Sequence, residues 1–149
     1  MMADQSTRYL RPGRADRMMM SMMNGLSRLG VTVAGSRELA VRGRSSGEWR
    51  TVPVNVLTLD GERYLVAPRG HAQWVRNLRA AGEGELRRGR RAEHFTAVEL
   101  DDAAKPAILR EYLRRWAWEV GRFFDGIDAD STDEQLAGVA PGFPVFRLT

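Results

Sequence analysis

The sequence predicts a single domain that is mainly β with some α: a closed β-barrel of about six mostly antiparallel strands with flanking helices. Its 149 residues fit one domain with a proper core. Several short apolar segments are separated by hairpin signals, one at an Asp-Gly pair and one near Gly89. Strand and helix patterns do not alternate regularly, which argues against a doubly wound parallel fold.

The chain is expected to begin with a flexible arm, residues 1–14, which ends in a Pro-Gly turn. The single barrel domain is expected to span residues 15–149 and to start with an amphipathic helix. The apolar positions of this helix recur at spacings of three and four: Met18, Met19, Met22, Met23, Leu26 and Leu29. Such a face leaves three roles open, namely packing on the domain's own core, covering a ligand pocket, or attachment to a membrane surface.

The first strands are predicted from β-branched and half-apolar segments. A short strand over 38–42 precedes a longer one over 51–59, and 63–68 returns after the Asp-Gly turn. Pro53 lies early in its strand, so it belongs at a sheet edge, a strand start or a bulge.

The next segments predict a short helix and a second hairpin. The helix covers 71–82 and ends at Gly82. Two further strands lie within 84–100, where Phe95 faces one side of the sheet and His94 the other.

The C-terminal part predicts a longer helix and a last strand. The helix covers 101–124, with Asp101 or Asp102 as N-cap and Pro106 within its first turns. An acidic loop follows, with a short helix that begins near Ser131, and residues 144–149 form the closing strand.

Arginine dominates the charge of the chain. The net charge is +4, and Lys105 is the one lysine among 23 basic residues, which leaves 22 arginines. A compositional bias of the genome would explain this excess. The alternative is an anionic partner, because guanidinium groups match phosphate and carboxylate: nucleic acid, an anionic membrane or a polyanionic cofactor.

Several kinds of site are missing from the sequence. Cysteine is absent and the two histidines, His71 and His94, lie far apart, so no metal site is expected. No apolar run reaches the roughly 20 residues of a membrane span, and no clear signal peptide is present, so a cytoplasmic location is expected. Because G-x-S-x-G, Walker A and H-E-x-x-H motifs are missing, catalytic residues stay unknown, and an enzyme would depend on a cofactor.

Two local clusters suit an anion. The first combines guanidiniums, hydroxyls and a glycine that permits positive φ: Arg42, Arg44, Ser45, Ser46, Gly47 and Arg50. In the second, a strand ends at Pro68, and Arg69 and Gly70 lead into a helix whose N-terminus can receive an anion. A solvated turn and ordinary core packing are the alternatives for these clusters.

Four segments, taken in order, resemble the deazaflavin-dependent nitroreductase family of actinobacteria. They are RGRSSGEWRTVPV (42–54), YLVAPRG (64–70), WVRNLRAAG (74–82) and PVFRLT (144–149). Members of that family are split β-barrel proteins that use coenzyme F-420, an 8-hydroxy-5-deazaflavin. The resemblance covers residues 15–149 and therefore implies a split barrel for this chain.

The resemblance also implies a set of cofactor-binding residues. Contacts to the phosphate and polyglutamate tail would come from Arg44, Ser45, Ser46, Gly47 and Arg50. The ring would lie along Val52, Pro53 and Val54. A second anion-binding segment and the helix after it would contribute Ala67, Pro68, Arg69, Gly70, Trp74 and Asn77. The family often has lysine at the positions of Ser45 and Arg69, so one cation is missing at Ser45.

The substrate-side tyrosines of some family members are not evident near the C-terminus of this chain. The substrate pocket is therefore assigned to one residue of the methionine-rich segment and to aromatics near 112–124: Met22, Tyr112, Trp116, Phe123 and Phe124. Together with Trp118, these aromatics cannot all face one side of a helix.

The activity that the resemblance implies is an oxidoreductase, like a nitroreductase or quinone reductase. It would transfer hydride from reduced F-420 to a small electron-poor acceptor: a quinone, an enone or a nitroaromatic. An FMN- or haem-binding split barrel and a non-catalytic F-420 carrier are alternatives. A nucleic-acid-binding barrel is more distant, because the acidic loop over 125–134 would repel phosphates, so no nucleic acid is expected.

The methionine-rich segment is also a candidate for contacts with partners. Proteins with this fold often form homodimers, and the apolar helix could mediate one. Residues 17–30 are the candidate for peripheral contact with the inner face of a membrane.

Overall fold

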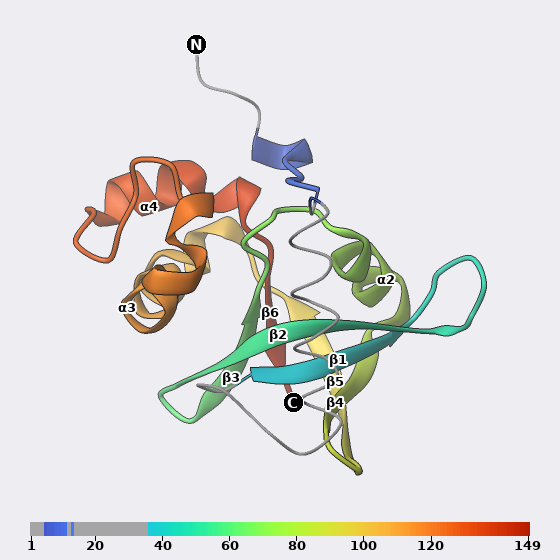
Figure 1. The fold of residues 1–149 in the computed structure, drawn as a ribbon. Helices are drawn as coiled ribbons and strands as arrows, with labels where there is room; N and C mark the ends of the chain where they lie inside the picture. Colours follow the sequence, from blue (N-terminus) through green and yellow to red (C-terminus); the bar gives the residue numbers. More distant parts are fainter. Residues whose placement is uncertain (1–4, 12, 14–35) are drawn as a thin grey trace.

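The computed structural model describes residues 5–11, 13 and 36–149, in which six strands form a closed barrel (Figure 1). The strand order is β1-β2-β3-β6-β5-β4, and every neighbouring pair is antiparallel. The fold class predicted from the sequence is confirmed. The expected methionine-rich helix, with Met22 and residues 17–30, lies outside the described residues.

The elements follow the predicted order. The strands are β1 (Ser36–Arg42), β2 (Trp49–Leu59), β3 (Glu62–Val66), β4 (Glu83–Arg88), β5 (Arg91–Glu99) and β6 (Val145–Leu148). The helices are α2 (Gln73–Ala81), α3 (Pro106–Val120) and α4 (Asp133–Val139). Short 3-10 turns are η1 (Gln5–Thr7), η2 (Asp102–Ala104), η3 (Gly121–Phe123) and η4 (Ala140–Gly142).

Strand β2 has two different halves. Its last four residues pair with β3, while Trp49–Asn55 pairs with β1. Within the described chain, this first half therefore has a neighbouring strand on one side only. Pro53 lies in it, opposite Glu38, which agrees with the expectation that this proline occupies an edge.

The core consists of two clusters on different parts of the molecule. The barrel cluster fills the inside of the strands and includes Leu39, Leu65, Phe95 and Phe146, all nearly inaccessible to solvent. The helical cluster lies where α3 and α4 pack together at one side of the barrel (Figure 1) and includes Leu109, Tyr112, Leu113, Leu136 and Phe143. Phe95 is buried and His94 exposed, as the alternation in β5 predicts.

The long helix begins later than predicted. Asp101 or Asp102 was expected to cap a helix over 101–124, but α3 starts at Pro106, its N-cap position is Lys105, and Asp102 belongs to η2. The physical reason is that proline, which has no N–H and a fixed φ, is favoured in the first turn of a helix. The buried Lys105 ammonium joins η2 to η4, because it donates to Asp102 Oδ1 (2.7 Å) and to the Ala140 carbonyl (3.0 Å).

The described part of the N-terminal arm, residues 5–11 and 13, contacts the rest of the molecule through hydrogen bonds. Leu10 N–H donates to the Arg69 carbonyl (2.8 Å), and His71 N–H donates to the Arg8 carbonyl (2.7 Å). The Arg8 guanidinium donates to the carbonyls of Phe123 (2.8 Å) and Gly142 (3.1 Å). Burial lowers the pKa of Arg8. These bonds join the arm to the segment between β3 and α2 and to the turns η3 and η4.

Candidate functional site

A cavity of about 690 Å³ lies between the first half of β2, the start of α2 and the C-terminal part of α3. Its size falls in the range of small-molecule sites, roughly 300–1,000 Å³. Most residues predicted to bind the cofactor line it: Arg44, Ser45, Ser46, Arg50, Val52, Pro53, Val54, Pro68, Arg69, Trp74 and Asn77. The structure thus brings together three separate segments that sequence patterns singled out.

Three of the predicted cofactor residues do not line the cavity. Gly47 lies in the β1–β2 turn with φ 71°, the left-handed conformation that favours glycine. Ala67 is buried in the barrel core. Gly70 pairs with Tyr9 of the N-terminal arm, and a Cβ at this glycine would lie 2.1 Å from the Arg8 carbonyl oxygen. We therefore assign these three residues a role in the course of the backbone around the cavity and not in its lining.

The β1–β2 turn is fastened to α2 by a buried amide. Asn77 Oδ1 accepts from the backbone N–H of Arg44 (3.1 Å) and from its guanidinium (2.8 Å). Arg50 contacts Glu48 at 3.8 Å, and both side chains are mostly exposed, so this pair holds the guanidinium weakly. Arg44 is thereby positioned at the cavity, while Arg50 can turn toward a bound anion.

The first turn of α2 forms another part of the wall. The cavity is lined here by Ala72, Gln73 and Trp74. Ala72 is the N-cap residue of α2, and because alanine has no side-chain acceptor, no side chain at this position caps the first N–H groups of the helix. The first N–H groups of a helix have no partner within the helix, and its dipole favours negative charge there. This end of α2 is therefore suited to a phosphate or carboxylate.

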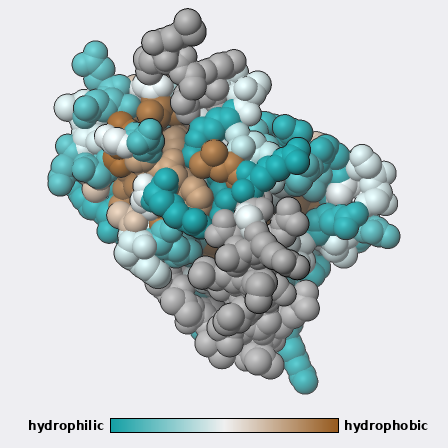
Figure 2. Space-filling view, turned by 45° about the horizontal axis from the view of Figure 1, so that its top comes forward, coloured by the Kyte–Doolittle hydropathy of each residue, from teal (hydrophilic) through white to brown (hydrophobic). Residues whose placement is uncertain are grey.

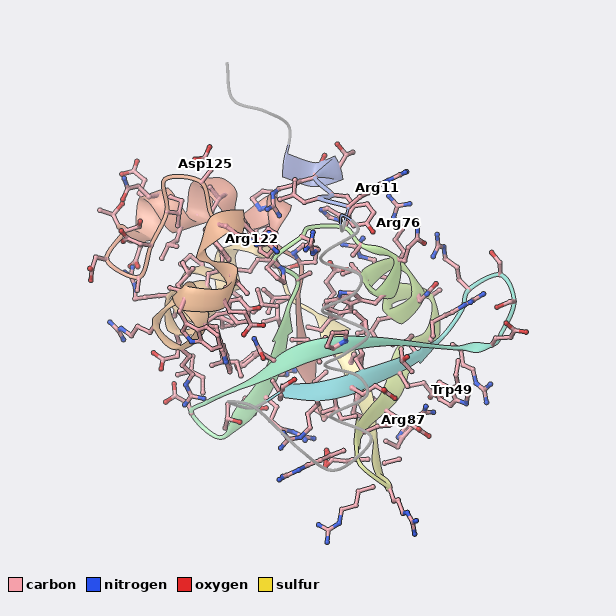
Figure 3. The ribbon with its side chains drawn as sticks, in the orientation of Figure 1. Arg11, Trp49, Arg76, Arg87, Arg122 and Asp125 are labelled. Carbon is pink, nitrogen blue, oxygen red and sulfur yellow. The ribbon has the colours of Figure 1, made fainter. Side chains whose placement is uncertain are left out.

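Phe123 forms an aromatic rim that the sequence partly predicted. Its ring lies between the guanidiniums of Arg69 and Arg122, at 4.6 and 4.5 Å from the ring centroid. Figure 3 shows Arg122 in the segment that follows α3. Arg69 also donates to the Leu10 carbonyl (3.0 Å), so the N-terminal arm supports this rim.

The predicted substrate-pocket residues separate into three groups. Tyr112 and Phe123 line the cavity, whereas Trp116 and Phe124 do not and are buried in the helical cluster. Phe124 stacks on Phe143 with 4.1 Å between centroids. Met22 lies outside the described residues. As predicted, the aromatics do not share one face, since Trp118 is 70% exposed.

The sequence did not predict the pair of Asn55 and Glu119, which lies on the wall of the cavity. Asn55 donates from Nδ2 to Glu119 Oε2 (3.2 Å), and both residues line the cavity beside Tyr112. Burial, and secondarily the charge of Glu119, raise the pKa of Tyr112 well above its ordinary value, while hydrogen bonding with Asn55 opposes this. Two signals were present: Asn55 interrupts a β-branched run, and Glu119 lies seven residues, about two turns, after Tyr112.

The lining combines four arginines, Arg44, Arg50, Arg69 and Arg122, with apolar and polar groups. In the space-filling view of Figure 2, apolar surface lies among hydrophilic side chains on the face that comes forward. Guanidiniums and helix N–H groups fit an anionic tail, and the side chains of Val52, Pro53, Val54 and Trp74 fit a flat ring. In residues 5–11, 13 and 36–149, no group of three or more His, Asp or Glu could hold a metal ion.

The described helices include none that is long and apolar enough to cross a membrane.

Comparisons with known proteins agree with the barrel fold. The model of the family described as F420H(2)-dependent quinone reductase matches residues 14–123. The solved structure of an F420-H2 dependent reductase (FDR-A) is similar to this chain, with a TM-score of 0.54 and 20% identity over 80% of this chain and 100% of that chain.

Two further solved structures are similar in fold. A chain described as a domain-swapped dimer has a TM-score of 0.56 and 17% identity over 91% of this chain and 94% of that chain. A protein of unknown function from Agrobacterium tumefaciens has a TM-score of 0.51 and 14% identity over 93% of this chain and 58% of that chain. At these identities the likeness shows the fold. A search of curated proteins finds no sequence match.

Proposed function

Because the chain belongs to the F420H(2)-dependent quinone reductase family, it is an F-420-dependent reductase, and we propose that the acceptor it reduces is a quinone. Membership rests on a match that covers residues 14–123 of the 149. The resemblance stated from the sequence motifs is confirmed at the level of an F-420-dependent split-barrel family. The family match also favours F-420 over FMN.

In this proposal, arginines that line the cavity bind the tail of the coenzyme. Arg44, Arg50 and Arg69 face the same cavity as the uncapped start of α2. Each charge-assisted contact to a phosphate or carboxylate contributes roughly 1.5–3 kcal/mol, so two or three contacts could dominate binding. The presence of these cations in one cavity, from the β1–β2 turn with the start of β2 and from the segment before α2, is the observation that carries the assignment.

The apolar part of the cavity would orient the ring. Val52, Pro53 and Val54 lie in the half of β2 that has one strand neighbour, and Trp74 lies across the same cavity. When bound, the reduced deazaflavin supplies a hydride. The side chains of this chain bind the ring, exclude water and hold the acceptor nearby.

Titration of the purified protein with reduced F-420, oxidised F-420 and FMN tests this function. We expect F-420 to bind, and Arg50→Ala to weaken its affinity about 10- to 150-fold, which is the equivalent of losing one such contact. Arg91→Ala is the matched control, because Arg91 lies on the β4–β5 hairpin and does not line the cavity.

The outcomes separate the claims. Failure of the wild type to bind F-420 would reject the proposed function. Unchanged affinity in Arg50→Ala would reject only the assignment of the β1–β2 turn. Binding without reduction of menadione, a soluble naphthoquinone, would favour the F-420 carrier.

Oligomeric state and domain extent are further parts of the proposal. A homodimer is supported by the similar fold of the chain described as a domain-swapped dimer. We place the start of the barrel domain at residue 15, beside the first residue of the family match. Light scattering of the purified chain measures the first, and limited proteolysis the second.

A further inference from the structure

The inner wall of the cavity, formed by Asn55, Tyr112 and Glu119, carries a carboxylate that has no role in the proposed binding of the coenzyme. Glu119 is half-buried in the last turn of α3 and lines the cavity, while Glu111, also half-buried, does not line it and pairs with Arg114 (3.3 Å) and Arg115 (3.7 Å). In the described part of the chain, Glu119 has no paired cation, and its hydrogen-bond partner is Asn55. A charged group at an inward position is costly, which suggests a role beyond packing.

Asn55 fixes the direction of this carboxyl group. The amide is 7% exposed and lies in β2 between Val54 and Val56. Its Nδ2 donates to Oε2 of Glu119 (3.2 Å), and both residues line the cavity. Neighbouring Tyr112 is held as a neutral phenol, because burial and the charge of Glu119 both raise its pKa.

We propose that Glu119 is the proton donor to the oxygen of the quinone acceptor, and that Asn55 is the positioning residue for its carboxyl group. This inference rests on the proposed function, in which a quinone becomes a hydroquinone. That change needs two electrons and two protons, of which a hydride brings both electrons and one proton. The second proton must come from a group that reaches the cavity, and Glu119 is such a group.

The proton step balances as follows. The O–H bond of the Glu119 carboxylic acid breaks, an O–H bond forms on the acceptor oxygen, and the carboxylate remains. The electron pair arrives with the hydride that the family's reduced coenzyme supplies. Glu119 then takes a proton from solvent, which receives the proton released when the coenzyme is oxidised.

The proposal requires that the carboxyl group of Glu119 is protonated when the acceptor is bound. Ligands that fill the cavity displace water, and desolvation favours the neutral form of a carboxyl group. Other titratable or charged groups that line the same cavity are Tyr9, Arg44, Arg50, Arg69, Tyr112 and Arg122. The arginines oppose the desolvation effect, so the test must measure protonation directly.

Nuclear magnetic resonance of ¹³C-labelled glutamate provides a readout other than activity. The protein loaded with oxidised F-420 is titrated with acid, with and without menadione, and the Glu119 signal is assigned by its loss in Glu119→Gln. We expect menadione to raise the pKa of Glu119 and menadione affinity to increase as pH falls. The same pH dependence should be absent from Glu119→Gln and present in Glu111→Gln, the matched control on α3 that does not line the cavity.

Turnover gives the second measurement. Glu119→Gln should reduce kcat with menadione about 100- to 10,000-fold, the usual contribution of general acid catalysis, while F-420 affinity stays within about two-fold. Glu119→Asp should recover part of the rate. A Glu119 pKa that menadione does not change, or wild-type turnover in Glu119→Gln, would overturn the inference. Loss of F-420 binding by the wild type would instead reject the proposed function.

Discussion

The two walls of the cavity differ in how the chain builds them. The barrel wall comes from β2, the β1–β2 turn and α2, and carries Arg44, Arg50 and Trp74. The helical wall comes from the end of α3 and η3, and carries Glu119 and Phe123. The first is an extended stretch of turn and strand together with the start of α2, whereas the second is Tyr112 and a short group of residues within 119–123. The barrel wall is therefore suited to grip an extended anion, and the helical wall to place single chemical groups.

The helical wall also depends on an irregularity in α3. Trp116 has non-helical dihedral angles, φ −127° and ψ 20°, within the helix. The turn after this kink presents Glu119 and Val120 to the cavity, while Trp116 itself packs on Tyr112 with 5.3 Å between centroids. The helical wall packs on the helical cluster and the barrel wall on the barrel cluster. A substitution in one cluster can therefore disturb one wall and leave the other in place.

The largest effect is expected from the two core clusters. Phe95→Ala, in the barrel cluster, should lower the free energy of unfolding by about 3–5 kcal/mol, and Leu113→Ala, in the helical cluster, by about 2–5 kcal/mol. Urea denaturation measures both. Where the variants still fold, Leu113→Ala should reduce menadione turnover more than F-420 affinity, because it disturbs the helical wall. Equal losses of both in Leu113→Ala would contradict the separation of the two walls.

The same contrast explains which parts of the molecule could be predicted from sequence. The barrel and its hairpins follow from local alternation and turn residues, and the barrel wall follows from contiguous motifs such as Arg44 to Val54. The pairing of Asn55 with Glu119 joins residues 64 positions apart, so no local pattern encodes it. The docking of Arg8 on the carbonyl of Phe123 is equally non-local, at 115 positions. The start of α3 was misplaced because two aspartates resemble caps and Pro106 outweighs them.

A smaller effect should come from Tyr112 on the helical wall. Its pKa is raised in the folded state above the value of 10.0 that it has when unfolded. The unfolded chain therefore loses this proton first, and the stability from the buried phenol is complete below pH 10 and declines as pH rises further. The decline is about 1.4 kcal/mol for each pH unit above 10 until the folded-state value is reached.

Tyr112→Phe should remove the part of the loss of stability above pH 10 that comes from ionisation of this phenol. Thermal unfolding of wild type and variant between pH 8 and pH 11 measures it, with Tyr64→Phe as the control at a half-buried tyrosine of β3. Parallel pH curves for the wild type and Tyr112→Phe would show that the phenol is not desolvated as the structure indicates.

The smallest effect concerns arginines that belong to neither wall. Arg88 and Arg91 lie directly opposite each other on β4 and β5, and like charges in this position are destabilising. Arg87, the residue before Arg88, lies beside Trp49 (Figure 3), and its guanidinium is 4.9 Å from the centroid of that ring. Arg91→Glu should therefore increase stability by about 0.2–1 kcal/mol, measured by urea denaturation, and leave F-420 affinity unchanged. Arg91→Gln, which removes the repulsion without adding an attraction, should give a smaller gain. A loss of F-420 affinity in Arg91→Glu would mean that cationic side chains outside the barrel wall also attract the coenzyme. The arginine excess of this chain would then contribute to ligand binding beyond the residues that line the cavity.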